Sequence, residues 1–239
     1  MTKVPCEAAV GLVIFDCDGV LVDSEPLSMR VLLQTVAENG AHIDPDTAYE
    51  LFLGRSLGTI TSLLKTDFDV DLDEIALERM RDNLYTAFRA ELQAVAGVRE
   101  ALDELSISRC VASSSQPERI RLSLGVTGLL DRFEPHIFSA TMVANGKPAP
   151  DLFLLAAHSM GIEPARCVVV EDSPAGIEAA HRAGMRVLCF AGASHADSQA
   201  HRDVLNRLEP DVIFDRMQQL PDLLVQLEKA GIFQSDGNT

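Results

Sequence analysis

The chain has 239 residues, 47% of them hydrophobic and 23% charged, so it can bury a sizeable core and lies outside the composition range of disordered proteins. Its formal net charge of −16 repels polyanions, which argues against nucleic acid and anionic membrane surfaces as partners. No apolar run approaches the about 18 residues that a membrane span needs, and cysteines without CxxC spacing predict reduced thiols in a cytoplasmic protein.

Six short apolar runs bounded by polar residues predict strands that are buried on both faces. They are residues 11–15, 110–112, 137–138, 167–170, 187–190 and 212–214. Helical patterns at residues 151–160 and 174–183 lie between the later runs, and each stops at a glycine. Strands that alternate with helices predict an α/β fold built on a doubly wound parallel sheet.

One long stretch, residues 26–96, breaks this alternation because it shows helical periodicity and no strand-like run. It follows the first strand, so it should lie over the carboxyl edge of the sheet, where open α/β sheets bind ligands. We therefore predict an α/β core, an all-helical cap and a C-terminal tail. The predicted bounds are residues 1–24 and 95–228 for the core, 25–94 for the cap and 229–239 for the tail.

The first strand ends in two carboxylates, Asp16 and Asp18, which are followed by Gly19. Acids this close repel each other unless a cation lies between them, and a hard divalent ion such as Mg²⁺ suits their oxygen ligands. A polar turn with an acidic helix cap explains the pair equally well when it is taken alone.

The fourth apolar run also ends in acids, Glu171 and Asp172. Parallel strands bring their carboxyl ends to one edge, so these acids are placed to complete an oxygen cage with Asp16 and Asp18. Capping of the helix that begins at Pro174 would account for Asp172, but not for two adjacent acids after a buried strand.

Two further features suit an anionic ligand. The second run ends in Ser113, Ser114 and Ser115, a turn that presents hydroxyls, backbone N–H groups and the positive end of a helix dipole. Lys147 is one of four lysines in the chain and lies in a loop with glycine and prolines. Neither feature is specific alone, since serine-rich turns are common and loop lysines are usually solvated.

The four motifs together, in this order across residues 11–215, resemble the haloacid dehalogenase superfamily. Within it they are similar to the β-phosphoglucomutase and phosphoglycolate phosphatase-like group, which has a helical cap. The resemblance implies a Rossmann-like core, Mg²⁺ as cofactor and phosphoryl transfer. It also implies that Asp16 is the nucleophile that forms an aspartyl-phosphate, and that Asp18 acts as general acid and then as base.

The same resemblance assigns roles to the remaining motif residues. Ser113, with Ser114 beside it, would bind the phosphoryl group, and Lys147 would bridge that group and the nucleophile. Asp172 would bind Mg²⁺ together with Asp16 and the backbone carbonyl of Asp18. Glu171 would contribute to the metal site directly or through water.

The reaction class depends on the acid at position 18 and on the first cap helix. A dehalogenase does not need the proton donor Asp18, and a Schiff-base phosphonatase would need a cap lysine, for which Lys65 is the only choice. Mutases of this group carry a histidine five residues after the position of Asp23, where this chain has Ser28. We therefore expect a phosphatase, with a sugar phosphomutase as the alternative and a non-catalytic binding protein as a minor third.

Substrate choice is expected to come from the cap. Gly54 and Arg55 match in place the substrate-specificity loop of the family, and Arg55 would bind a hydroxyl, phosphate or carboxylate of the substrate. The alternative is a surface arginine before a helix that Ser56 caps. The expected partner is a small phosphorylated metabolite, namely a sugar, sugar alcohol or sugar acid phosphate, and the expected state is a monomer or weak homo-oligomer.

Overall fold

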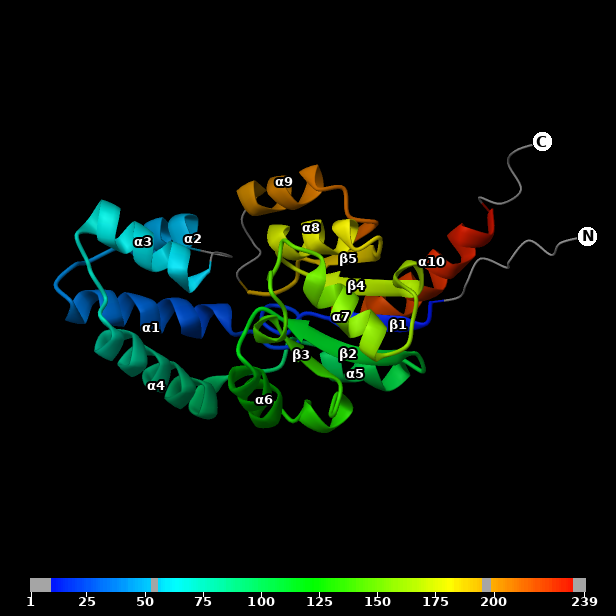
Figure 1. The fold of residues 1–239 in the computed structure, drawn as a ribbon, viewed down its shortest axis with the longest axis horizontal. Coiled ribbons are helices and arrows are strands. Elements are labelled where there is room, and N and C mark those ends of the chain that lie inside the picture. Colours follow the sequence, from blue (N-terminus) through cyan, green and yellow to red (C-terminus); the bar gives the residue numbers. More distant parts are fainter. Residues whose placement is uncertain (1–9, 53–55, 195–198, 234–239) are drawn as a thin grey trace, which may run out of the picture.

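A computed structural model of the chain describes residues 10–52, 56–194 and 199–233. Its centre is a sheet of six parallel strands in the order β3-β2-β1-β4-β5-β6 (Figure 1). The strands are β1 Leu12–Phe15, β2 Ser108–Ser113, β3 Ile137–Ser139, β4 Cys167–Glu171, β5 Arg186–Phe190 and β6 Val212–Phe214. The predicted doubly wound parallel sheet is confirmed, and each strand overlaps one of the six apolar runs.

Helices cover both faces of the sheet because side chains alternate along each buried strand. Val13 and Phe15 of β1 belong to one apolar cluster, whereas Leu12 and Ile14 belong to the other. The first face carries α5 Val98–Glu104, α6 Pro117–Val126 and α10 Leu220–Phe233; the second carries α7 Asp151–Ser159, α8 Pro174–Arg182 and α9 Gln199–Arg207. Short 3₁₀ turns lie at η1 Leu130–Arg132, η2 Ala140–Met142, η3 Pro164–Arg166 and η4 Met217–Gln219.

The register of the central strands decides which residues meet at the carboxyl edge. Phe15, the last residue of β1, pairs with Val111 of β2 and with Val170 of β4. The residues that follow these three strands therefore lie side by side. This is the point at which the strand order reverses, where open α/β sheets bind their ligands.

The segment between β1 and α5 folds as four helices that lie beside this edge (Figure 1). They are α1 Glu25–Glu38, α2 Pro45–Phe52, α3 Leu57–Phe68 and α4 Glu74–Glu91. They enclose their own apolar cluster, which includes Val36, Phe52 and Leu64. The connections to the core run side by side, since the Asp23 N–H donates to the Gln93 carbonyl over 3.0 Å. We call these four helices the cap.

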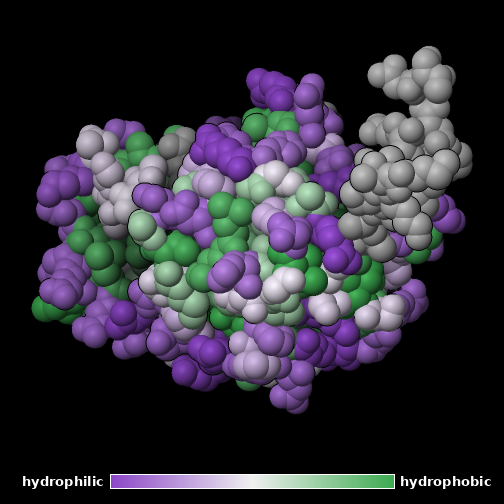
Figure 2. All heavy atoms as spheres, turned by 45° about the vertical axis from the view of Figure 1, so that its right-hand side comes forward, coloured by the Kyte–Doolittle hydropathy of each residue, from purple (hydrophilic) through white to green (hydrophobic). Residues whose placement is uncertain are grey.

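Figure 2 shows one face of the molecule, on which hydrophobic residues form patches between hydrophilic ones. The large hydrophobic side chains that are exposed each lie on a different element, at Leu57, Ile75, Val126, Met142, Leu154, Val204 and Val225. Among the described helices, none has the length and apolar character to cross a membrane. The four described cysteines, Cys17, Cys110, Cys167 and Cys189, are buried free thiols, as the sequence predicts.

Candidate active site

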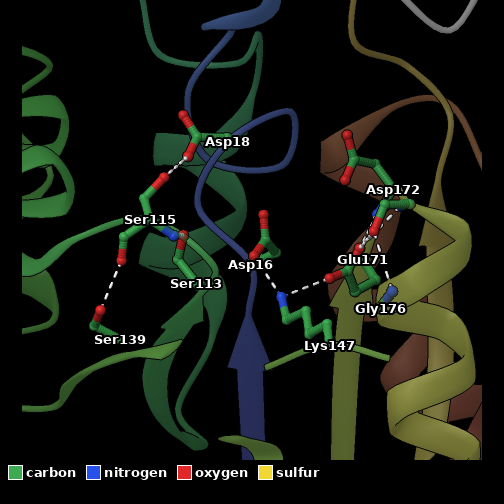
Figure 3. A network of polar contacts seen from close by, with 10 residues as sticks. Asp16, Asp18, Ser113, Ser115, Ser139, Lys147, Glu171, Asp172 and Gly176 are labelled. Atoms are coloured by element: carbon green, nitrogen blue, oxygen red, sulfur yellow. Dashed lines mark hydrogen bonds and ion pairs between the residues drawn. The ribbon is translucent and has the colours of Figure 1, made fainter. Parts of the chain in front are cut away.

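Asp16 continues β1 by one residue, with its backbone N–H donating to the Val170 carbonyl of β4 over 3.0 Å. The chain then turns sharply, and Gly19 takes a positive φ of 79°, a conformation that glycine adopts without steric cost. The Gly19 N–H closes the turn on the Val22 carbonyl at 2.8 Å. This turn holds Asp16 and Asp18 at the carboxyl edge of the sheet (Figure 3).

Lys147 lies between two acids at this edge, and its side chain is only 3% exposed. Its Nζ is 2.6 Å from Asp16 Oδ1 and 2.6 Å from Glu171 Oε1, and it lies 4.9 Å from the centre of the Phe153 ring. Burial opposes the charge of Lys147, but the carboxylates of Asp16 and Glu171 outweigh burial and raise its pKa. Lys147 is therefore a buried partner of Asp16 and not a solvated loop lysine.

Glu171 uses both of its oxygens on neighbouring groups of the chain. Oε1 accepts from Lys147, while Oε2 accepts from the backbone N–H of Asp172 and from the N–H and hydroxyl of Ser173, each at 2.9 Å. A Cβ on Gly176 would lie under 3.0 Å from three atoms of this carboxyl group, so only glycine leaves room for it. Glu171 thus anchors Lys147 and the start of α8, whereas Ser173 caps that helix through Gly176 N–H.

The charges around Asp16 bear on whether a metal ion fits here. Burial raises the pKa of Asp16 well above its ordinary value; Lys147 counteracts this, and the carboxylates of Glu171 and Asp172 add to it. A further cation would let Asp16 ionise, and carboxylate oxygens suit Mg²⁺. The chemistry of these carboxylates therefore suits such an ion, and Asp16 and Asp172 are its predicted ligands.

The four acids do not form a metal site by themselves. Within the described ranges, no three His, Cys, Asp or Glu side chains are arranged to hold a metal ion. The carboxylates of Asp18 and Glu171 bind protein donors instead. Any Mg²⁺ site here would therefore need oxygen ligands other than these side chains, and the predicted metal-binding roles of Asp16, Asp18, Glu171 and Asp172 stay predictions.

Asp18 is held by three donors, none of which the sequence analysis predicted as a partner of Asp18, although it placed Ser115 in an anion-binding turn. The Ser24 hydroxyl donates to Oδ1 over 2.6 Å, Arg119 Nη2 donates to Oδ1 over 2.9 Å, and the Ser115 hydroxyl donates to Oδ2 over 2.7 Å. Burial alone would raise the pKa of Asp18, but Arg119 and the two hydroxyls outweigh it and hold the pKa below its ordinary value.

The serine turn after β2 is organised around its backbone. Ser113 is 1% exposed and its Oγ accepts the Ser115 N–H over 3.1 Å. The Ser139 hydroxyl, at the end of β3, donates to the Ser115 carbonyl over 2.7 Å (Figure 3). Ser114 is exposed. Ser113 and Ser115 thus lie on the same side of Asp16 as Asp18, while Glu171 and Asp172 lie on the other. Gly54 and Arg55, the expected specificity residues, lie outside the described residues.

Comparison with known proteins agrees with this arrangement. Residues 10–184 match the profile of the haloacid dehalogenase-like hydrolases. The chain is 31% identical over 212 residues to the 6-phosphogluconate phosphatase of Escherichia coli, which covers 88% of this chain and 93% of that protein. It is also 32% identical over 177 residues to a phosphorylated carbohydrates phosphatase of Thermotoga maritima, covering 72% of this chain and 81% of that one.

A solved structure is similar over nearly its whole length. It is a conserved haloacid dehalogenase-like protein of unknown function from Agrobacterium tumefaciens, with 37% sequence identity and a TM-score of 0.82. The match covers 92% of this chain and 99% of that chain, so it includes both the sheet and the cap.

Proposed function

We propose that this chain, which belongs to the haloacid dehalogenase-like hydrolase family, is a phosphatase that hydrolyses a small phosphorylated carbohydrate. The observation that carries the proposal is the buried contact of Lys147 with Asp16, at 2.6 Å, on the carboxyl edge of the sheet. A carboxylate whose charge is compensated by a fixed cation is suited to attack phosphorus, since phosphoryl transfer depends on positioning and charge neutralisation. The named carbohydrate phosphatases among the relatives support the substrate class.

In the first step, a carboxylate oxygen of Asp16 attacks the phosphorus atom, and the bond from phosphorus to the carbohydrate oxygen breaks. Protonated Asp18 donates its proton to that leaving oxygen, which departs as a hydroxyl group. Lys147 and the Ser113 hydroxyl hold phosphoryl oxygens during the transfer. The product on the protein is an aspartyl-phosphate at Asp16.

In the second step, a water molecule attacks the aspartyl-phosphate. Asp18, now ionised, accepts a proton from this water, and the bond between Asp16 and phosphorus breaks to release inorganic phosphate. Asp18 ends the cycle protonated, as it began. The three donors around Asp18 hold its carboxylate beside Asp16 in both steps.

Asp16, Asp172 and the backbone carbonyl of Asp18 are the groups that would hold Mg²⁺. When bound, this ion supplies positive charge to the phosphoryl oxygens and to Asp16. Glu171 would act on the reaction indirectly, because it binds Lys147 and the start of α8.

A phosphatase is favoured over a mutase by the side chain at position 28. The position at which related mutases carry a histidine is occupied by Ser28, whose Oγ lies 3.4 Å from Arg119 Nη2. Serine cannot act as an acid or base near neutral pH, so the first cap helix offers no second proton-transfer group at this point.

The proposal is tested by measuring phosphate release from p-nitrophenyl phosphate and from sugar, hexitol and sugar acid phosphates in the presence of Mg²⁺. The wild-type protein should turn over, and Asp16→Asn should be inactive, whereas the exposed helix substitution Asp222→Asn should have no effect. Acid quenching during turnover should trap a phosphoryl group on Asp16, detectable by peptide mass spectrometry. Wild-type activity in Asp16→Asn would falsify the assignment of the nucleophile.

A further inference from the structure

Arg119 is the one member of the Asp18 cluster that comes from a helix far away in the sequence. It lies in the first turn of α6, which is part of the core, and its side chain is 24% exposed. Its Nη2 donates to Asp18 Oδ1 over 2.9 Å. This pair is formed within the protein, where a hydrogen-bonded ion pair is stronger than on the surface.

The same guanidinium group also contacts the two long helices of the cap. Its Cζ lies 5.2 Å from the centre of the Phe88 ring of α4, a side chain that is 0% exposed. Its Nη2 lies 3.4 Å from the Ser28 hydroxyl of α1. Arg119 Nε is buried and has no hydrogen-bond partner among the described residues. One side chain of the core thus touches the acid–base group and both α1 and α4.

These contacts leave Asp18 little freedom to rotate. Ser24 and Arg119 bind Oδ1, and Ser115 binds Oδ2, so donors from three different elements define the plane of the carboxyl group. Ser24 precedes α1 of the cap, Ser115 follows β2, and Arg119 belongs to α6. The planar guanidinium can hold the carboxylate and stack on Phe88 at the same time, which the point charge of a lysine cannot do.

We propose that Arg119 is a positioning residue that couples the seating of the cap on α6 to the orientation of the Asp18 carboxyl group. When α1 and α4 lie against α6, Phe88 and Ser28 hold the guanidinium where it binds Oδ1. A proton donor contributes to catalysis only within hydrogen-bond reach of the leaving oxygen, so this alignment acts on the step in which Asp18 donates its proton. The inference rests on the proposed phosphatase reaction.

Substrates with leaving groups of different basicity distinguish a residue that positions the Asp18 carboxyl group from one that only stabilises the packing of the cap on α6. Phenyl phosphate and p-nitrophenyl phosphate have leaving groups of nearly the same shape, but phenolate is the more basic and depends more on protonation. The measured quantity is kcat/KM, which includes the step in which the leaving group departs. Loss of acid alignment should therefore lower kcat/KM for phenyl phosphate more than for p-nitrophenyl phosphate.

For Arg119→Ala we expect kcat/KM on phenyl phosphate to fall by about 10–100-fold, less than the about 100–10,000-fold that general acid catalysis contributes, because Asp18 itself remains. The fall on p-nitrophenyl phosphate should be much smaller, and Arg119→Lys should recover part of the loss. Arg121→Ala, on the same helix, removes an exposed arginine paired with Glu134 and is the matched control, for which both esters should be unaffected.

Coupling to the cap is tested by Phe88→Leu, which leaves Asp18 and Arg119 in place. We expect the same selective loss on phenyl phosphate, whereas Phe68→Leu, a cap substitution whose ring packs on Phe52, should not change the ratio of the two esters. If Arg119→Ala does not fold, Arg119→Lys and Phe88→Leu carry the test. Equal losses on both esters, or no loss, overturn the inference. A wild-type protein that is inactive on both esters overturns the proposed function instead.

Discussion

Gly176→Ala is the smallest substitution that should disturb the site without touching a reacting group. Gly176 is the third residue of α8, and a Cβ there would lie under 3.0 Å from the carboxyl carbon and both oxygens of Glu171. Glu171 cannot yield easily, because Lys147, the Asp172 and Ser173 N–H groups and the Ser173 hydroxyl all bind it. Either the start of α8 moves away or the carboxylate leaves its partners.

The cost follows from these contacts. Overpacking of a tight interior costs about 1–3 kcal/mol, and each hydrogen bond lost to a charged acceptor costs about 1.5–3 kcal/mol. Against these losses, alanine stabilises a helix by about 1 kcal/mol relative to glycine. With one such bond lost, we expect Gly176→Ala to lower the free energy of unfolding by about 1.5–5 kcal/mol.

The measurement is urea denaturation of wild type and variant, with Gly58→Ala as the control. Gly58 is also in the first turn of a helix, α3, but a Cβ there meets only Ser56 Oγ at 4.0 Å, so alanine should be neutral or stabilising. In a Glu171→Ala background the penalty of Gly176→Ala should disappear, because the clashing group is gone. Equal stability of the two glycine variants would refute the reasoning, as would an undiminished penalty in the Glu171→Ala background.

Three further predictions concern charge and burial. Lys147→Met should abolish phosphate release, while Lys65→Met, which removes an exposed lysine, should not; comparable activity of both variants would contradict the role of Lys147. Burial raises the pKa of Asp16, so the protonated side chain favours the folded state at low pH, and this stabilisation is lost as pH rises through the folded-state pKa. Asp16→Asn should therefore raise the melting temperature at pH 8 in EDTA, and a lowered melting temperature would contradict this argument. Burial raises the pKa of Cys189 to about 12 and that of Cys167 to about 11. Neither thiol should therefore react with Ellman's reagent at pH 8 before urea unfolds the protein. Rapid labelling of either thiol in the native protein would contradict this prediction.

The parts of the fold that the sequence predicts are those encoded locally. Continuous apolar runs mark the buried parallel strands, and acids directly after two of them mark the carboxyl edge, because parallel strands end on the same side. Asp16 directly follows β1, and Glu171 is the last residue of β4. Lys147 could be assigned only through the family resemblance, since nothing in its own loop specifies that it is buried between two carboxylates.

The residues that the sequence did not reveal act across long sequence separations. Arg119 is 101 residues from Asp18; Ser115, which the sequence places in the serine turn but not in contact with Asp18, is 97 residues from it. Each is an ordinary polar residue in a turn or on a helix, and the fold, which sets the serine turn and the start of α6 beside the end of β1, brings both to Asp18. Gly176 is similar, because a glycine early in a helix gives no local sign that it accommodates a carboxylate.

The two aspartates of the proposed reaction have pKa values in the order opposite to the one that the reaction would need. Burial leaves Asp16, the proposed nucleophile, with a raised pKa, whereas Arg119 and the hydroxyl donors overcome burial and hold the pKa of Asp18, the proposed proton donor, below its ordinary value. A divalent cation beside Asp16 lowers its pKa, and a phosphoryl dianion beside Asp18 raises its pKa. Binding of both ligands would therefore shift the two pKa values in the directions that the proposed reaction requires. Each aspartate also has a cationic partner within the protein, since Arg119 lies 2.9 Å from Asp18 and Lys147 lies 2.6 Å from Asp16.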